Sequence, residues 1–298
     1  MGDIRADLEN VNCPVCQADN AAHHLEVKGF SVVKCRDCSM AYINPRLKDQ
    51  SIYNIYKDNY FLREGYTFED FGYGDYDLTA HLRDRTFIRW YDEAIPYLKV
   101  KSGSALDVGC ATGRFLMILK ERNWKVNGIE LDRGMCAELN EKGFDVNSEP
   151  LESQKAESTF DLITLFDVVE HLPHVREDFK VLHKLLSDDG SIVLVTPNIE
   201  SLQSKIFGKR WFQLKPLEHI SYFSPRTLKT MAEESGFKVV RAFSTGQYAD
   251  LGFVNHRLSR YDFPILASIF DKIIGLFGLK DSSWYIGTGS TYMILQKA

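Results

Sequence analysis

Short apolar runs alternate with amphipathic segments from about residue 101 to the end of the chain. The strand-like runs, rich in Val, Ile and Leu, are residues 104–108, 125–129, 160–165 and 191–195. The segments with apolar side chains at helical spacing are residues 114–119, 132–143 and 175–186. Continuous apolar strands are typical of a parallel sheet that is buried on both faces. Their alternation with helices predicts an α/β domain.

Residues 46–100, which precede this domain, are rich in aromatic side chains. Their first half crowds tyrosines and glycines together, and we interpret it as an ordered loop. Their second half has apolar residues at roughly helical spacing over 81–98, which predicts an amphipathic helix. The tyrosine-rich loop is a candidate lid over a binding site, although aromatic side chains also commonly fill the contact between two domains.

An insertion at residues 247–289 separates the last two predicted strands and is expected to set substrate specificity. It contains the most apolar segment of the chain, residues 263–279, which Asp271 and Lys272 interrupt. This segment is shorter than the ~20 apolar residues that span a bilayer, so we predict no transmembrane segment. A core helix, a lid, a dimer helix and a membrane-surface helix are all compatible with the pattern.

The charge balance limits the kinds of partner. The 298 residues are 44% hydrophobic and 26% charged, with a net charge of −5, which is ordinary for a folded globular protein. The chain therefore lacks the broad positive field that non-specific binding to nucleic acid needs, and a small-molecule partner is expected instead. Residues 1–12 lack the apolar core of a signal peptide, which predicts a cytoplasmic location.

Four cysteines form two C-x2-C pairs, Cys13 with Cys16 and Cys35 with Cys38. Two such pairs in a short hairpin-like segment are typical of a tetrahedral Zn²⁺ site made of thiolates. A segment this small buries too little surface to fold alone, so the metal supplies the missing stability. Four sulfurs leave no open coordination position, which predicts a structural zinc in a zinc ribbon over residues 1–45. The alternatives are unrelated buried cysteines or a pair of redox dithiols.

A tight turn follows the first strand of the α/β domain. Gly109 and Gly113 permit sharp turning and let a ligand approach bare backbone at the start of the next helix. The second strand ends at Glu130, where a carboxylate accepts hydrogen bonds from ribose hydroxyls. The loop reads D-x-G-x-x-x-G and lacks the G-x-G-x-x-G order of dinucleotide sites. Together these features predict a site for an adenosine-containing ligand.

Three segments closely resemble the motifs of class I S-adenosylmethionine-dependent methyltransferases: residues 106–113 (LDVGCATG), 128–132 (GIELD) and 160–172 (FDLITLFDVVEHL). The resemblance covers about residues 101–298 and implies a Rossmann-like core with a seven-stranded sheet, whose last strand, residues 291–296, runs antiparallel. It also implies S-adenosyl-L-methionine as cofactor and S-adenosyl-L-homocysteine as product.

The resemblance further implies roles for individual residues. The methionine end of the cofactor would be held by the glycine loop, namely Asp107, Gly109, Cys110, Ala111 and Gly113. The ribose would be bound by Glu130 and Leu131, and the sulfonium would lie near Phe166 and Asp167.

Three further points follow from this assignment. Ala111 stands where many members of the family have glycine. Because its methyl group is small, we expect the affinity for the cofactor to be reduced but not abolished. Arg85 is a candidate partner for the carboxylate of the cofactor. The adenine contact stays open among Asn147, Ser148 and Glu149.

Two histidines are candidate catalytic bases. His171 follows the fourth strand, where an imidazole can take a proton from a hydroxyl. His219 lies in the phrase LEHISYFSP, which resembles members linked to sugar and secondary-metabolite methylation. Either histidine can equally be a structural residue.

We therefore expect methyl transfer to a hydroxyl of a small or medium-sized acceptor, such as a sugar, a polyketide or a phenol. If the apolar segment 263–279 is a lid, it agrees with a lipid-linked or aromatic acceptor, and peripheral membrane contact is also compatible with it. The oligomeric state is not predicted. The alternatives are a methyltransferase of ribosomal or transfer RNA, with the zinc ribbon recognising RNA, and a non-catalytic scaffold that binds S-adenosylmethionine.

Overall fold

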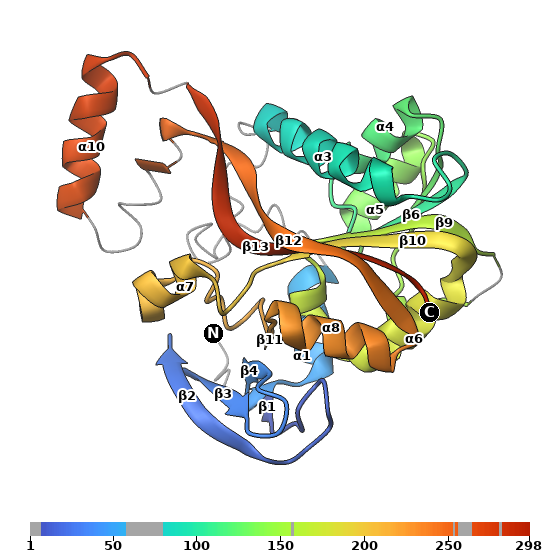
Figure 1. Cartoon of the computed structure of the whole chain (residues 1–298), viewed down its shortest axis with the longest axis horizontal. Helices are drawn as coiled ribbons and strands as arrows, with labels where there is room; N and C mark the ends of the chain where they lie inside the picture. Colours follow the sequence, from blue (N-terminus) through green and yellow to red (C-terminus); the bar gives the residue numbers. More distant parts are fainter. Residues whose placement is uncertain (1–6, 58–79, 156–157, 253, 256–263, 280–281) are drawn as a thin grey trace.

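The computed structural model describes residues 7–57, 80–155, 158–252, 254–255, 264–279 and 282–298. A seven-stranded sheet forms its centre, with the order β12-β13-β10-β9-β6-β7-β8 (Figure 1). The strands are β6 (Ser104–Val108), β7 (Lys125–Ile129), β8 (Asp145–Asn147), β9 (Phe160–Phe166), β10 (Leu186–Thr196), β12 (Phe237–Asp250) and β13 (Ser283–Lys297). The five strands β10, β9, β6, β7 and β8 lie side by side in this order, and each pair of neighbours is parallel. Strand β13 is antiparallel to both β10 and β12. This is the expected Rossmann-like sheet with an antiparallel last strand, so the predicted fold class is confirmed.

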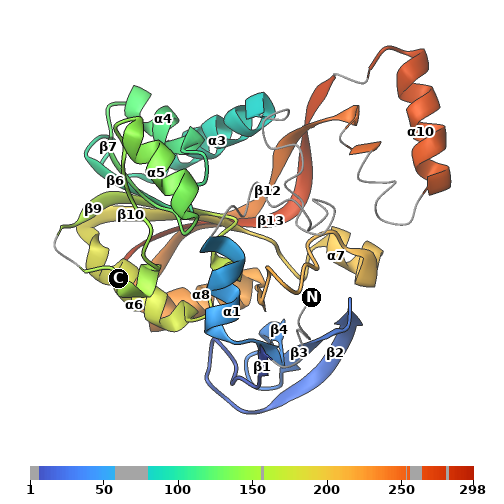
Figure 2. The same cartoon turned by 180° about the vertical axis from the view of Figure 1, so that it is seen from behind.

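Helices cover both faces of the sheet (Figures 1 and 2). One face carries α3 (Ala80–Ala94), α4 (Arg114–Glu121) and α5 (Arg133–Glu141), and the other carries α6 (Val175–Leu185) and α8 (Pro225–Glu234). Phe115 and Leu119 of α4 are buried in one apolar layer, and Phe179 and Leu182 of α6 are buried in the other. Full burial of each such side chain stabilises the fold by about 1.5–3 kcal/mol.

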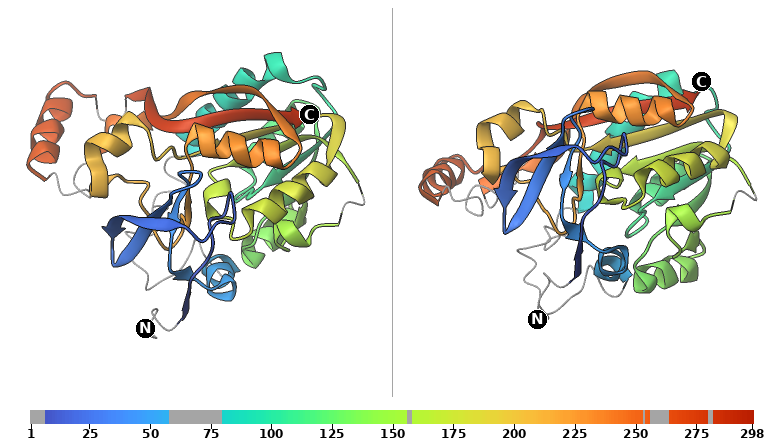
Figure 3. Two further views of the ribbon diagram at one scale, coloured as in Figure 1. Left: turned by 60° about the horizontal axis from the view of Figure 1, so that its bottom comes forward. Right: turned by 90° about the horizontal axis from the view of Figure 1, so that it is seen from below.

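The cysteine-containing N-terminal segment is joined to the central domain through a second sheet. It consists of β2 (Ala21–Val27), β3 (Phe30–Cys35), β4 (Ala41–Ile43) and β11 (Ser221–Tyr222), in the order β11-β4-β3-β2. A separate two-stranded sheet pairs β1 (Leu8–Glu9) with β5 (Arg46–Leu47). Since β11 follows β10 in the chain, the central domain contributes the edge strand of the ribbon sheet. Seen from below, this sheet lies beside α7 (Leu202–Phe207) and α8 (Figure 3).

A helix occupies part of the segment that the sequence led us to interpret as loop. Helix α1 (Asp49–Lys57) begins with an acidic residue in its first turn, which favours a helix N-terminus, and buries Ile52. Ile52, Ile55 and Tyr56 follow helical spacing and pack in one apolar cluster with Ile220. The loop expectation is therefore wrong for these residues, because an apolar face at helical spacing lies within the tyrosine-rich stretch and packs against Ile220. Residues 58–79, with most of the candidate lid, lie outside the described part of the chain.

The last two strands are longer than predicted. β12 and β13 pair from Phe237 with Lys297 as far as Asp250 with Ser283, so both arms of the expected insertion continue the sheet as a hairpin. Helix α10 (Pro264–Leu276) lies at the far end of this hairpin, away from the central sheet (Figure 1).

Four apolar side chains of α10 are largely exposed: Ile265 by 76%, Ile269 by 52%, Ile273 by 49% and Leu276 by 82%. The core-helix interpretation is wrong for these four side chains, because no other part of the chain that the structure describes covers them. None of the helices among the described residues is long and apolar enough to cross a membrane.

Candidate active site

A cavity of about 320 Å³ opens at the carboxyl ends of β6, β7 and β9. This is where ligands bind in open α/β sheets, and the volume falls at the lower end of the range for small-molecule sites. The cavity is lined by eight of the nine residues predicted to bind the cofactor: Asp107, Gly109, Cys110, Ala111, Glu130, Leu131, Phe166 and Asp167. Gly113 does not line it and instead caps α4. The cavity is also lined by both candidate bases, His171 and His219.

The glycine loop is tightly packed against its neighbours. Gly109 has a φ of +71°, and a Cβ there would lie 2.6 Å from Cγ2 of Val168. Gly113 has a φ of +72°, and a Cβ would lie 2.5 Å from Cδ2 of Leu139. Neither position has room for a side chain, and both have the left-handed conformation that glycine tolerates. The loop therefore turns over bare backbone, as expected for a ligand held at a helix start.

Glu130 is fixed at the end of β7 by two backbone donors. The N–H of Ala111 donates to Oε2 at 2.8 Å, and the N–H of Asp132 donates to Oε1 at 2.9 Å. Burial raises the pKa of Glu130 to about 7, against the lowering effect of these hydrogen bonds. A carboxylate offers about four lone-pair sites, so each oxygen keeps one for a ribose hydroxyl.

Asp107 lies at the end of β6 and is also buried. Its Oδ1 accepts a hydrogen bond of 2.6 Å from the hydroxyl of Thr164 on β9. Burial raises the pKa of Asp107 to about 7, and the nearby charge of Glu130 raises it further. Five carboxyl groups line the cavity against three Lys and Arg side chains, and a bound cation such as a sulfonium would favour their ionised form.

The end of β9 combines an aromatic cluster with a strained residue. Phe166 packs against Trp90 and Phe115, with ring centroids 5.0 and 4.9 Å apart. The next residue, Asp167, has a φ of +54°, which is uncommon outside glycine and is held by a hydrogen bond from its N–H to O of Val195 at 2.8 Å. Burial raises the pKa of Asp167 to about 6. Aromatic faces attract cationic groups, which fits a sulfonium at this point.

The two candidate bases lie against each other although 48 positions separate them in the chain. The ring centroids of His171 and His219 are 4.7 Å apart, with the planes at 83°. Nδ1 of His171 lies 2.9 Å from the carbonyl of Glu218 and 2.9 Å from the hydroxyl of Tyr56. Nδ1 of His219 lies 2.8 Å from the carbonyl of Gln213. Burial lowers the pKa of His171 to about 3 and holds that of His219 well below its ordinary value, so both imidazoles are neutral.

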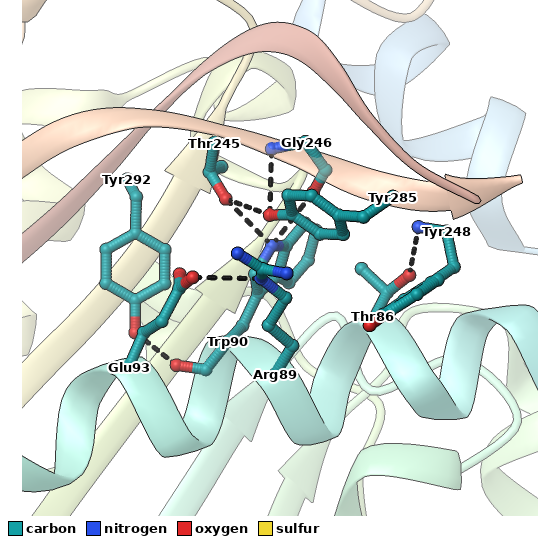
Figure 4. A network of polar contacts seen from close by, with 9 residues as sticks. All are labelled: Thr86, Arg89, Trp90, Glu93, Thr245, Gly246, Tyr248, Tyr285 and Tyr292. Atoms are coloured by element: carbon teal, nitrogen blue, oxygen red, sulfur yellow. Dashed lines mark hydrogen bonds and ion pairs between the residues drawn. The ribbon is translucent and has the colours of Figure 1, made fainter.

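Helix α3 and the β12–β13 hairpin also contribute to the lining and are joined by hydrogen bonds (Figure 4). The indole N–H of Trp90 donates to the hydroxyl of Thr245 at 3.1 Å and to the carbonyl of Gly246 at 3.0 Å. The N–H of Tyr248 donates to the hydroxyl of Thr86 at 2.9 Å. These hydrogen bonds fasten helix to hairpin, so the hairpin reaches the cavity with Tyr248 in its lining.

Two sets of residues that the sequence offered as cofactor contacts do not line the cavity. Arg85 lies over the ring of Tyr248, 4.0 Å from its centroid, and does not line the cavity, whereas Arg83 does. Arg83 and Arg85 are two residues apart, so they leave the helix on different faces.

At the adenine end, the three candidates Asn147, Ser148 and Glu149 are likewise outside the lining, because Asn147 turns to cap the backbone of Glu149 with a 2.7 Å hydrogen bond. Pro150, Leu151 and Glu152 line the cavity instead.

Sequence reasoning missed several other residues of the lining. Glu170 and Lys215 carry charge into the cavity, and Tyr56 reaches it from α1. Glu170 had a detectable signal, since it is an acid directly before a candidate base at the end of a strand. Tyr56 had none, because only the folded chain brings it to His171.

The four N-terminal cysteines meet in one cluster. Their four sulfur atoms all lie within 4.8 Å of one another. Sγ of Cys13 is 3.4 Å from that of Cys38, and Sγ of Cys16 is 3.5 Å from that of Cys35. These separations exceed the ~2.05 Å of a disulfide and approach the ~3.8 Å that tetrahedral Zn–S bonds of ~2.3 Å give. The cluster is compatible with the predicted zinc ribbon.

Comparison with known proteins shows the family to which the chain belongs. A family model described as a methyltransferase domain matches residues 79–242. The chain is 25% identical over 166 residues to a ubiquinone biosynthesis O-methyltransferase of Pseudomonas aeruginosa, a match that covers 51% of this chain and 70% of that protein. It is 22% identical over 219 residues to the C-methyltransferase NovU of Streptomyces niveus, covering 71% of this chain and 47% of NovU.

Among solved structures, a SAM-dependent methyltransferase from Archaeoglobus fulgidus superposes with a TM-score of 0.50 and 22% identity. That superposition covers 80% of this chain and all of the other. The fold, the glycine loop and the acidic end of β7 place the chain in one class, the S-adenosylmethionine-dependent methyltransferases. The chain belongs to the methyltransferase-domain family whose model it matches over more than half its length.

Proposed function

We propose that the protein transfers a methyl group from S-adenosylmethionine to a hydroxyl of a small or medium-sized acceptor. The observation that carries this proposal is the position of His171 and His219, which lie side by side in the cavity that also contains Phe166 and Asp167. An oxygen nucleophile, unlike a thiolate, must lose a proton as it is methylated, and neutral imidazoles next to the acceptor space promote that loss.

In this proposal the chain's own residues chiefly bind and orient. Bound S-adenosylmethionine supplies the electrophilic methyl group. Glu130 accepts the ribose hydroxyls, the backbone of the glycine loop contacts the methionine end, and Arg83 is the candidate partner of the carboxylate. The aromatic cluster around Phe166 keeps water from the sulfonium and aligns the methyl group with the acceptor oxygen. Alignment of the reacting atoms supplies much of the barrier reduction in such transfers.

The relatives point to the acceptor class only coarsely. One is named for O-methylation in ubiquinone biosynthesis and another for C-methylation. A phenol, a sugar or a polyketide hydroxyl fits a cavity with both aromatic walls and buried polar groups. We propose further that the four N-terminal cysteines hold a structural zinc ion, since their clustering places four thiolates around one point.

The experiment that tests oxygen as the acceptor uses methyl-13C-labelled S-adenosylmethionine with extract from cells that lack the protein. We expect one extract component to gain one methyl group, with the 13C chemical shift of a methyl on oxygen. His171→Ala and His219→Ala should each slow this transfer while S-adenosylhomocysteine binding stays nearly intact. A labelled methyl on carbon or nitrogen, or full activity in both variants, contradicts the proposal.

A further inference from the structure

We infer that Glu170, His171 and His219 bind a divalent transition-metal ion at the acceptor end of the cavity, an inference that rests on the proposed hydroxyl methylation. One potential ligand atom of each residue lies within 4.8 Å of the other two. Glu170 and His171 follow β9, whereas His219 comes from the segment before β11. The fold thus gathers two imidazoles and a carboxylate from distant parts of the chain around one point.

Both histidines are held in the state that a metal ligand requires. A backbone carbonyl can only accept a hydrogen bond, so Nδ1 of His171 carries the proton that it donates to Glu218 O at 2.9 Å. The same holds for His219 and the carbonyl of Gln213 at 2.8 Å. Nε2 of each ring then keeps its lone pair. Metal-binding histidines characteristically donate their other N–H to a carbonyl or carboxylate, which fixes the ring and the tautomer.

Glu170 supplies an independent observation. Its side chain is 1% exposed, and its Oε2 accepts a 2.9 Å hydrogen bond from the hydroxyl of Thr196. Its Oε1 is buried and has no hydrogen-bond partner within the described residues. A buried carboxylate oxygen without a partner is destabilising and rare in native proteins, and a bound cation would satisfy it.

The ligand set indicates the kind of ion. Two imidazoles and one carboxylate, with the remaining positions open to a cavity, suit Mn²⁺, Fe²⁺, Co²⁺ or Zn²⁺ better than Mg²⁺, which prefers oxygen ligands and water. Lys215 lines the same cavity and acts electrostatically on Glu170 and both histidines. It also forms a 3.5 Å ion pair with Oε2 of Glu218, and that carboxylate balances part of the lysine's charge.

The ion would define the substrate more closely. An acceptor with two adjacent oxygens, such as a catechol or a vicinal diol, can chelate it through the open positions. The metal then lowers the pKa of the coordinated hydroxyl, whose proton passes to water. The oxygen forms a bond to the methyl carbon while the electrons of the S–CH3 bond return to sulfur, leaving a thioether and an ether. In this step the two histidines promote loss of the hydroxyl proton through the ion that they hold, which refines the role that the proposed function gives them.

Mn²⁺ alone is a suitable probe, because thiolates of the cysteine cluster prefer softer ions. Protein purified with its zinc is titrated with Mn²⁺ and followed by electron paramagnetic resonance. We expect one Mn²⁺ per chain, with Glu170→Gln and His219→Asn each weakening its binding by about tenfold or more. His81→Gln, at an exposed histidine on α3 outside the cavity, is the matched control and should bind Mn²⁺ like the wild type.

S-adenosylhomocysteine binding and thermal unfolding, measured on the same samples, show whether each variant is folded. Wild-type protein that binds S-adenosylhomocysteine but no Mn²⁺ at millimolar concentration overturns the metal site and leaves the proposed function standing. Undiminished Mn²⁺ binding in folded Glu170→Gln and His219→Asn overturns it as well. Methylation of acceptors that have a single isolated hydroxyl, at the same rate with and without Mn²⁺, overturns the chelation of substrate.

Discussion

Ala111 occupies a backbone conformation that suits glycine. Its φ is +48°, and the left-handed region is unfavourable for a residue with a Cβ by roughly 1–2 kcal/mol. The loop keeps this conformation because the N–H of Ala111 is drawn to Glu130 by a 2.8 Å hydrogen bond. The methyl group of Ala111 thus strains the loop.

Ala111→Gly should therefore raise the free energy of unfolding, by about 1 kcal/mol in urea titration. The matched control is Ala137→Gly, at an exposed position within α5, which should lower it by about 1 kcal/mol. A destabilisation of similar size in both variants would show that the strain at Ala111 is not the controlling factor.

Glu130 gives the protein a pH dependence of known sign. Burial raises its pKa from 4.5 to about 7, so between these values the folded protein retains a proton that the unfolded chain releases. The contribution of Glu130 to stability is therefore most favourable below pH 4.5 and declines as the pH rises towards about 7.

Glu130→Gln removes this titration. The free energy of unfolding of the wild type, relative to Glu130→Gln, should fall by about 3 kcal/mol across that window, as 1.36 kcal/mol corresponds to one pKa unit. Urea titrations of both ligand-free proteins at several pH values measure the difference. If the difference in the free energy of unfolding does not change with pH, the carboxylate of Glu130 is exposed to water and its pKa is not raised.

At the scale of elements, the ribbon sheet and the cavity share a segment of chain. The N–H of Ile43, at the end of β4, donates to the carbonyl of Ile220 at 2.9 Å, and β4 pairs with β11 directly afterwards. Ile220 follows His219 in the sequence. Trp211 and Leu214, from the same connection, pack into the apolar cluster of the ribbon. The ribbon thus positions the segment that carries His219.

Loss of zinc should therefore affect the acceptor end of the cavity more than the cofactor end. Cys35→Ser is expected to release the metal and to lower the turnover, while the affinity for S-adenosylhomocysteine stays nearly unchanged. Metal analysis, a methyl-transfer assay and calorimetry measure the three quantities. His24→Gln, at an exposed residue of β2, is the control and should keep zinc and activity. Unchanged zinc content in Cys35→Ser would mean that the cysteine cluster is not the metal site.

At the scale of the whole molecule, local patterns in the sequence predicted most of the central sheet. The apolar runs marked its strands, and Gly109 and Glu130 marked the cofactor end of the cavity, because both depend on residues close together in the chain. Contacts between distant residues carried no local signal. Tyr56 meets His171 across 115 positions, and β11 joins the ribbon sheet as a strand of two residues.

The hairpin of β12 and β13 shows the same limit. Nothing in the local sequence predicted that Thr245, Gly246 and Tyr248 would join this hairpin to α3, because hydrogen bonds to Trp90 and Thr86 make that connection (Figure 4). The resemblance to a known family supplied the antiparallel last strand, whereas the extension of the hairpin beyond the family core emerged only from the fold.

The proposed function requires that the cavity at the ends of β6 and β7 is the cofactor site. Isothermal titration calorimetry with S-adenosylhomocysteine tests this most directly. We predict that one molecule binds per chain. Glu130→Ala should weaken this binding by about 1.5–3 kcal/mol, roughly 10- to 150-fold in the dissociation constant, because a charged acceptor of hydrogen bonds is lost. Failure of the wild-type protein to bind at millimolar concentration, or equal affinity in Glu130→Ala, would contradict it.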